Sequence, residues 1–148
     1  MVDMQETLLG LFTEVAIVEH LSRTRFQNGF TGKLEAGHFG ILNYFLRTNR
    51  PPDSVSGIAF AFQVDEDVIS DRVEYLCRLG YVSVTSALKR GDAVVVVTQD
   101  GRAARDEQIS RMRPQILEIV SEIPVEDLKI TVQTLREIRL VLDNLPDR

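Results

Sequence analysis

The chain has 148 residues, 44% of them hydrophobic, which suits one domain with a real core or one domain with a helical extension. A formal net charge of −5 excludes a generally basic coat for nucleic acid but leaves room for a local basic patch. The only cysteine, Cys77, excludes an intrachain disulfide, and no Cys/His cluster has zinc-site spacing, so we expect no metal and no cofactor. No basic leader and no apolar run of roughly 18 residues is present, so we expect a cytoplasmic protein that does not enter a membrane.

The first predicted helix runs from Glu6 to about Ser22. Its apolar residues recur every three or four positions, as on one helix face: Leu8, Leu11, Phe12, Val15, Val18 and Leu21. The segment from Gln27 to Gly32 has two glycines and no apolar period, so the chain should turn there. A second helix is predicted from about Glu35 to Arg47, and Pro51-Pro52 stops it because a residue before proline leaves the helical region.

The stretch from Ser54 to Thr98 has the order of a winged helix-turn-helix. Asp53 or Ser54 can cap a short helix, and Gln63-Val64 makes a tight turn. A longer helix, capped by Asp65, should then run to about Leu79 and stop at Gly80. The inner faces of the two helices are predicted to comprise Val55, Ile58, Ala59 and Phe62, and Ile69, Val73, Leu76 and Leu79.

Two β-branched runs follow this longer helix, from Tyr81 to Thr85 and from Ala93 to Thr98. The segment from Leu88 to Asp92 lies between them and is typical of the tip of a β-hairpin. This hairpin is the predicted wing.

Two helices are predicted after the wing. Thr98 can cap a helix from Gln99 to about Glu122, in which Pro114 should produce a kink because it removes one backbone hydrogen bond. The last helix follows Pro124, with apolar positions Val125, Leu128, Val132, Leu135, Ile138 and Leu142. Because these terminal apolar stripes lie far in sequence from the winged core, we expect a second copy of the chain to cover them in a homodimer.

The predicted fold class is mainly α with a small β-hairpin wing, a winged helix-turn-helix flanked by N- and C-terminal dimerisation helices. We expect residues 1–32 to form the N-terminal dimerisation helix and loop, residues 33–98 the winged helix-turn-helix, and residues 99–148 the C-terminal dimerisation helices.

Two motifs on either side of the wing resemble those of the MarR family of bacterial transcriptional regulators. Leu76-x-x-Leu79-Gly80-Tyr81-Val82 is similar to the family's exit from the recognition helix. Val97-Thr98-Gln99-Asp100-Gly101-Arg102 is similar to its "leucine-threonine-x-x-glycine-arginine" junction between the wing and the fifth helix. Their order and separation carry the resemblance, which covers nearly the whole chain.

The resemblance implies a homodimer that binds a pseudo-palindromic operator in double-stranded DNA, with a recognition helix of each protomer in the major groove. It also implies that a small aromatic ligand lowers the affinity, in a pocket for which Phe12, Phe26, Phe30, Phe39 and Phe45 are candidates. The implied DNA-binding positions are Glu66, Asp67, Ser70, Asp71, Arg72 and Glu74 on the recognition helix, with Lys89 and Arg90 on the wing. The family usually has small hydroxyl, amide or basic residues at the groove-facing helix positions, and its acidic-x-arginine wing tip is not reproduced here.

The carboxylates of the recognition helix have two interpretations. Asp65, Glu66 and Asp67 complement the positive end of the helix dipole, which is worth about 0.3–1 kcal/mol each. The second interpretation is that acids at this place weaken operator binding, because phosphate neutralisation dominates affinity and a carboxylate repels a phosphate. A carboxylate can bind DNA favourably only where it reaches a base edge and accepts a hydrogen bond from cytosine N4. Residues 33–98 carry seven Lys or Arg and eight Asp or Glu, so this domain is not net basic. The domain must therefore bind DNA weakly, or else concentrate its positive charge at Arg47, Arg50, Arg72, Lys89 and Arg90.

Two functions therefore compete. The first is a MarR-type DNA-binding transcriptional regulator, and the alternative is a winged-helix dimer with weakened or lost DNA binding that acts as a protein-interaction or ligand-binding module. An enzyme is not expected, because His20 and His38 have no nucleophile or acid at catalytic spacing and no phosphate-binding glycine loop is present.

Overall fold

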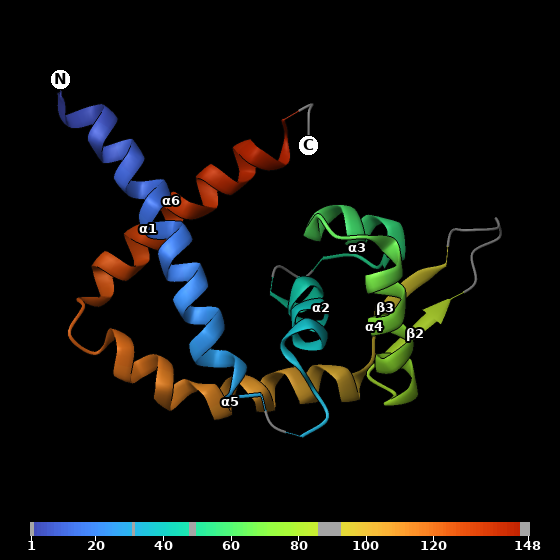
Figure 1. Cartoon of the computed structure of the whole chain (residues 1–148). Coiled ribbons are helices and arrows are strands. Elements are labelled where there is room, and N and C mark those ends of the chain that lie inside the picture. Colours follow the sequence, from blue (N-terminus) through green and yellow to red (C-terminus); the bar gives the residue numbers. More distant parts are fainter. Residues whose placement is uncertain (1, 31, 48–49, 86–92, 146–148) are drawn as a thin grey trace. The chain divides into compact units, whose positions relative to one another are not determined.

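The computed structural model describes residues 2–30, 32–47, 50–85 and 93–145, which form helices and a small sheet (Figure 1). The elements, in chain order, are α1 (Val2–Gln27), α2 (Ala36–Leu46), β1 (Asp53–Ser54), α3 (Val55–Phe62), α4 (Glu66–Arg78), β2 (Val82–Thr85), β3 (Val94–Val97), α5 (Gln99–Val120) and α6 (Val125–Asp143). The chain divides into two compact units, residues 1–112 and 113–148, and the division falls within α5. Among the described residues, no helix is long and apolar enough to cross a membrane.

The buried core lies entirely in the first unit, where α2, α3 and α4 meet the sheet. Its largest fully buried side chains are Ile41, Leu42, Ile58, Ile69, Leu76 and Val95. Three of the four residues in the predicted inner stripe of α4 are buried, namely Ile69, Val73 and Leu76, whereas Leu79 at the C-cap is half-buried. The core therefore fixes α4 against α2 and α3 by one helix face and leaves the other face to solvent.

The sheet has the strand order β1-β3-β2 among the described residues, and both pairings are antiparallel. The predicted hairpin is confirmed, with Val82 opposite Val97 and Thr85 opposite Val94. The sequence reasoning missed the third strand, in which Asp53 pairs with Val95. A two-residue strand has no alternating pattern of its own, so it is recognised only by its pairing with β3.

The predicted helix ends are mostly right. The Ser54 hydroxyl accepts from the Gly57 N–H at 3.0 Å, and the Thr98 hydroxyl accepts from the Gly101 N–H at 3.1 Å, so both residues cap their helices. Asp65 occupies the N-cap position of α4, but its side chain makes no capping hydrogen bond. After α4, Gly80 has a φ of +75°, and the Tyr81 N–H donates to the Leu76 carbonyl at 2.9 Å.

The helix bounds differ from the prediction mainly in α1, which extends at both ends of the expected range. Its first turn contains polar residues that break the apolar period without breaking the helix. Helix α5 continues through Pro114, whose ring nitrogen has no hydrogen to donate.

The terminal helices leave much apolar surface exposed. None of the described side chains of α1 or α6 is buried. The exposed apolar residues include Leu8, Leu9, Phe12, Val15, Val18 and Leu21 on α1, and Val125, Ile130, Val132, Leu135, Leu140, Val141 and Leu142 on α6. For α6 this matches the expectation that the winged core does not bury the stripe. Helix α5 departs from the same expectation, because its Met112 is buried.

Candidate nucleic-acid interface

A short connection joins α3 to α4 and produces the helix-turn-helix. Gln63 adopts a left-handed conformation, with φ 53° and ψ 46°, and its Nε2 donates to the Phe60 carbonyl at 2.7 Å. The Val64 N–H donates to the Ala59 carbonyl at 3.1 Å. These bonds end α3 abruptly and redirect the chain, so α4 starts at a fixed angle to α3.

Helix α4 has one buried and one exposed face. Every predicted groove-facing position is exposed: Glu66, Asp67, Ser70, Asp71 and Glu74. Among the residues that the structure describes, none of the four carboxylates in this set forms a salt bridge. The outer face is therefore an accessible row of negative charge with one hydroxyl in it.

Arg72 does not project freely from this face. A Cβ added at Gly37 would lie 2.7 Å from the Arg72 Cζ, so the guanidinium lies directly on the backbone of α2 at that glycine. The side chain is half-buried as a result. Contact with DNA would require Arg72 to leave this position or to use the part of the guanidinium that α2 leaves open.

The same side of α4 is attached to α2 by Tyr75. Its ring stacks on His38 with centroids 4.3 Å apart, and its hydroxyl donates to the Lys33 carbonyl at 2.6 Å. Arg78 lies with its Cζ 6.0 Å from the Tyr75 centroid. The sequence reasoning missed these contacts, because spacing places Arg72, Tyr75 and Arg78 on one helix side but does not reveal what they pack against.

His38 lies among groups of both charges. Burial lowers the pKa of His38 from its ordinary value, the Glu35 carboxylate raises it, and the Arg72 guanidinium lowers it. Its Nδ1 accepts the Glu35 N–H at 3.2 Å, which holds the first turn of α2. His38 is therefore a structural acceptor in the first turn of α2.

A second tethered cation, Arg50, lies just before β1. Its Cζ is 4.6 Å from the Tyr44 ring centroid, and the Tyr44 hydroxyl donates to Asp53 Oδ2 at 2.9 Å. Burial and the neighbouring Asp53 raise the pKa of Tyr44 above its ordinary value. Arg50 is thus held close to a carboxylate, which reduces the positive potential it offers to a phosphate.

The strands of the wing are described, but its predicted contact residues are not. Lys89 and Arg90 lie outside the described residues, as does the rest of the predicted tip from Leu88 to Asp92. Their role in DNA binding stays a prediction.

The five phenylalanines do not form a single cluster. Phe45 is buried in the core, Phe12 is 54% exposed, and Phe30 contacts Phe39 with centroids 5.5 Å apart. A cavity of about 210 Å³ in the first unit is lined instead by Gly32, Lys33, Leu34, Tyr81, Ala104, Glu107, Gln108 and Arg111. The predicted ligand pocket among the phenylalanines is therefore still only a prediction.

The two sequence motifs acquire physical reasons in the structure. A Cβ on Gly101 would lie 2.0 Å from the Tyr81 carbonyl oxygen, so only glycine allows α5 to approach the end of α4 this closely. The same carbonyl accepts the Thr98 N–H at 3.0 Å, and the Thr98 hydroxyl donates to the Gly80 carbonyl at 2.6 Å. The "threonine-x-x-glycine" junction therefore joins the exit of α4 to the start of α5.

Comparison with solved structures shows where this arrangement occurs. The transcriptional regulator BldR from Sulfolobus solfataricus superimposes with a TM-score of 0.71 and 24% identity, over 97% of this chain and 99% of that one. A MarR family protein from Bacillus stearothermophilus gives a TM-score of 0.72 with 13% identity, covering 95% of this chain and 98% of its own. BpsR from Bordetella bronchiseptica, whose DNA binding is regulated by 6-hydroxynicotinic acid, gives a TM-score of 0.64 with 20% identity, over 89% of this chain and 98% of that one.

At the level of sequence, no protein-family model and no curated protein matches the chain. The likeness is thus one of structure, and it extends over nearly the full length of both chains in each pair. It includes the helices before and after the winged core as well as the core itself. The chain has the fold of the MarR family of transcriptional regulators.

Proposed function

We propose that this protein is a MarR-type transcriptional regulator that binds a pseudo-palindromic operator as a homodimer. The observation that carries the proposal is the construction of α4. Its inner face is locked into the core by Ile69, Val73 and Leu76, while its whole outer face is exposed at the end of a helix-turn-helix. A helix held rigidly by one side and exposed on the other is suited to enter a major groove.

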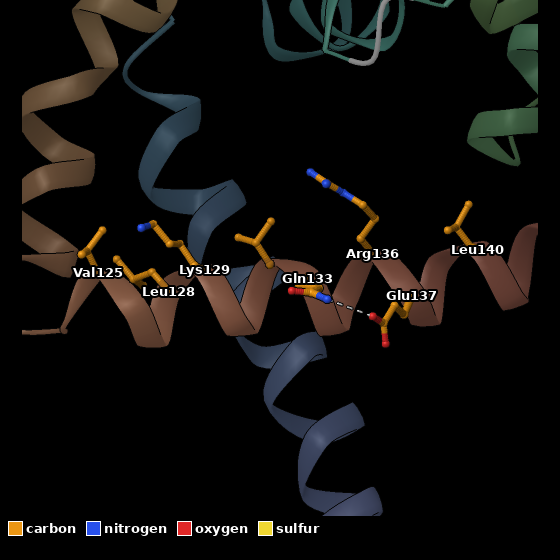
Figure 2. A pocket seen from close by; sticks show the side chains of 8 residues that line it. Val125, Leu128, Lys129, Gln133, Arg136, Glu137 and Leu140 are labelled. Carbon is orange, nitrogen blue, oxygen red and sulfur yellow. Dashed lines mark hydrogen bonds between the residues drawn. The ribbon is translucent and has the colours of Figure 1, made fainter.

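The dimer is supported by the exposed apolar surface of the terminal helices. A groove of about 620 Å³ runs along α6 and is lined by Val125, Leu128, Lys129, Val132, Gln133, Arg136, Glu137 and Leu140 (Figure 2). Helix α6 has no buried residue, although its apolar residues recur with helical spacing. Covering such a surface with a second copy of the chain removes apolar area from water. This burial stabilises the dimer by about 25 cal/mol per Å².

Binding of DNA is tested directly by titration. Purified protein is added to labelled promoter DNA that flanks its own gene, at low salt and near physiological salt, with a shuffled duplex of equal length as the control. We expect a complex that prefers the promoter and weakens as salt rises, because phosphate contacts release counterions. No complex with the promoter at low salt would contradict the proposal.

The contact residues are tested by substitution. Arg72→Ala and Arg90→Ala should each weaken binding, and Arg102→Ala on the exposed side of α5 is the matched control. Loss of one phosphate contact also reduces the slope of the logarithm of the binding constant against the logarithm of salt concentration by about one. Unchanged affinity and slope in both variants would show that α4 and the wing do not dock as proposed.

The proposal includes release from DNA by a small aromatic ligand. It is suggested by BpsR, whose DNA binding is regulated by 6-hydroxynicotinic acid. A panel of small aromatic acids, tested against the preformed complex, would reveal release as a fall in the bound fraction. A complex unaffected by every member of the panel would leave the DNA-binding proposal in place without ligand control.

A second candidate function has its own supporting observation. Four exposed carboxylates of α4 lack a salt bridge within the described part of the chain, and Arg72 is turned to α2. This charge pattern favours a winged-helix dimer that has lost operator binding and acts in protein interaction or ligand binding. Under this alternative the salt titration shows no complex, whereas the dimer is retained.

A further inference from the structure

His38 occupies a place where one proton changes several contacts. It lies in the first turn of α2, accepts the Glu35 N–H at Nδ1, and stacks on Tyr75 of α4. Tyr75 is held from its other end by the hydrogen bond from its hydroxyl to the Lys33 carbonyl, just before α2. The ring of His38 therefore joins the start of α2 to the recognition helix.

The hydrogen bond defines the protonation state of this ring. A neutral imidazole that accepts at Nδ1 carries its proton on Nε2. Uptake of a second proton, from solvent, places it on Nδ1 and turns the acceptor into a donor. The Glu35 N–H then loses its partner, and two N–H groups point at each other.

We propose that His38 is an acid-labile clamp between α2 and the recognition helix α4, whose protonation loosens the contact between the two helices. The effect on DNA rests on the function proposed above, whereas the loosening itself is a property of the fold.

The charges around the ring point the same way. Besides Glu35, which attracts a proton, the groups facing His38 are Arg72 and Tyr75 on α4, with Arg78 at the Tyr75 ring. Arg72 lies on the α2 backbone at Gly37, next to His38, so an imidazolium would stand beside a guanidinium. Burial and Arg72 outweigh Glu35, and the pKa of His38 is lowered overall.

The sign of the pH effect follows from this direction. A histidine whose pKa is lower in the folded state binds fewer protons there than in the unfolded state, so folding stability rises with pH. The contribution of His38 is fully present above its unfolded pKa of about 6.5 and is lost as the pH falls through the lower folded value. Acidification should therefore destabilise the α2–α4 contact.

The sequence makes the test clean, because the chain has only two histidines, His20 and His38. His38→Gln keeps a side-chain acceptor three residues after the N-cap but cannot titrate. His20→Gln, on the exposed side of α1, is the matched control. Urea unfolding of the full-length chain is followed from about pH 7.5 to about pH 5.5, a range that brackets the ordinary histidine pKa.

We expect the urea midpoint of the unmodified chain and of His20→Gln to fall on acidification, and that of His38→Gln to fall by less than half as much. NMR of the unmodified chain, which needs no variant to fold, should show His38 titrating below about pH 6.5 and the Tyr75 ring resonances shifting with the same midpoint. Parallel loss of stability in all three proteins, or Tyr75 resonances that do not follow His38, would overturn the clamp.

Binding to promoter DNA separates this inference from the function on which it depends. If DNA binds, the affinity of the unmodified chain should fall relative to His38→Gln as the pH is lowered, and a constant ratio of the two affinities would overturn any effect of the clamp on α4. If no DNA binds at any pH, the proposed function fails. The urea and NMR measurements then still decide whether the clamp exists.

Discussion

Helices α4 and α6 have the same kind of apolar spacing and opposite burial. In α4 the stripe of Ile69, Val73 and Leu76 is buried, with Ile69 and Leu76 at 0% exposure. In α6 no residue is buried, and Val125 of its apolar stripe is 61% exposed. The difference shows that apolar periodicity specifies which face seeks a partner, whereas burial depends on whether the same chain supplies one.

The first prediction tests the core side of this comparison. Leu76→Ala should lower the free energy of unfolding by about 2–5 kcal/mol, because it removes a fully buried side chain and leaves a cavity. The control is Ile130→Ala on α6, which should cost under about 0.5 kcal/mol at a concentration where the chain is monomeric. Both are measured by urea unfolding, and equal losses would mean that α6 is packed within the monomer.

The second prediction compares a buried glycine at the start of α5, Gly101, with an exposed glycine in α1, Gly10. Gly101→Ala should destabilise the fold by about 1–3 kcal/mol, because the added methyl meets the Tyr81 carbonyl, which is backbone and cannot rotate away. Gly10→Ala in α1 should stabilise by about 0.5–1 kcal/mol, since its Cβ would meet nothing within 4 Å and alanine favours helix. Thermal unfolding reports both, and a tolerated Gly101→Ala would contradict the close approach of α5.

The third prediction concerns the exposed apolar groove of α6. Val132→Asp places a charge in the α6 groove and should weaken self-association at least about tenfold, or about 1.4 kcal/mol. Thr134→Asp adds the same charge to α6 outside the groove and should leave association nearly unchanged. Sedimentation of both variants over a concentration series gives the constants. Equal weakening by the two would place the dimer contact elsewhere.

The smallest expected effect concerns the outer face of α4. Asp71→Arg should strengthen nonspecific DNA binding at low salt a few-fold, about 1 kcal/mol or less, because an exposed repulsive charge becomes attractive. The gain should shrink as salt screens it. Glu107→Arg, an equal charge change on α5, serves as the control. No gain beyond that control would indicate that the outer face of α4 is turned away from DNA.

Much of the fold could be predicted from sequence because its signals are local. The order of helices, the hairpin, the inner stripe of α4 and the caps at Ser54 and Thr98 all follow from residues within one or two turns of each other. The Asp65 cap failed as a hydrogen bond because a residue type at the N-cap position does not fix the direction of its side chain. Of the predicted site, the exposure of the α4 carboxylates followed from helical spacing alone.

What the sequence determined by itself was thus the set of elements and the face each one presents. Only the tertiary structure decided that β1 pairs with β3, that Arg72 lies on Gly37, and that Tyr75 reaches Lys33 across 42 residues of sequence. Contacts of this kind depend on how packed elements meet, and no local period encodes the partner of a side chain. For that reason the acidic outer face of α4 was predictable, while the His38–Tyr75 attachment behind it was not.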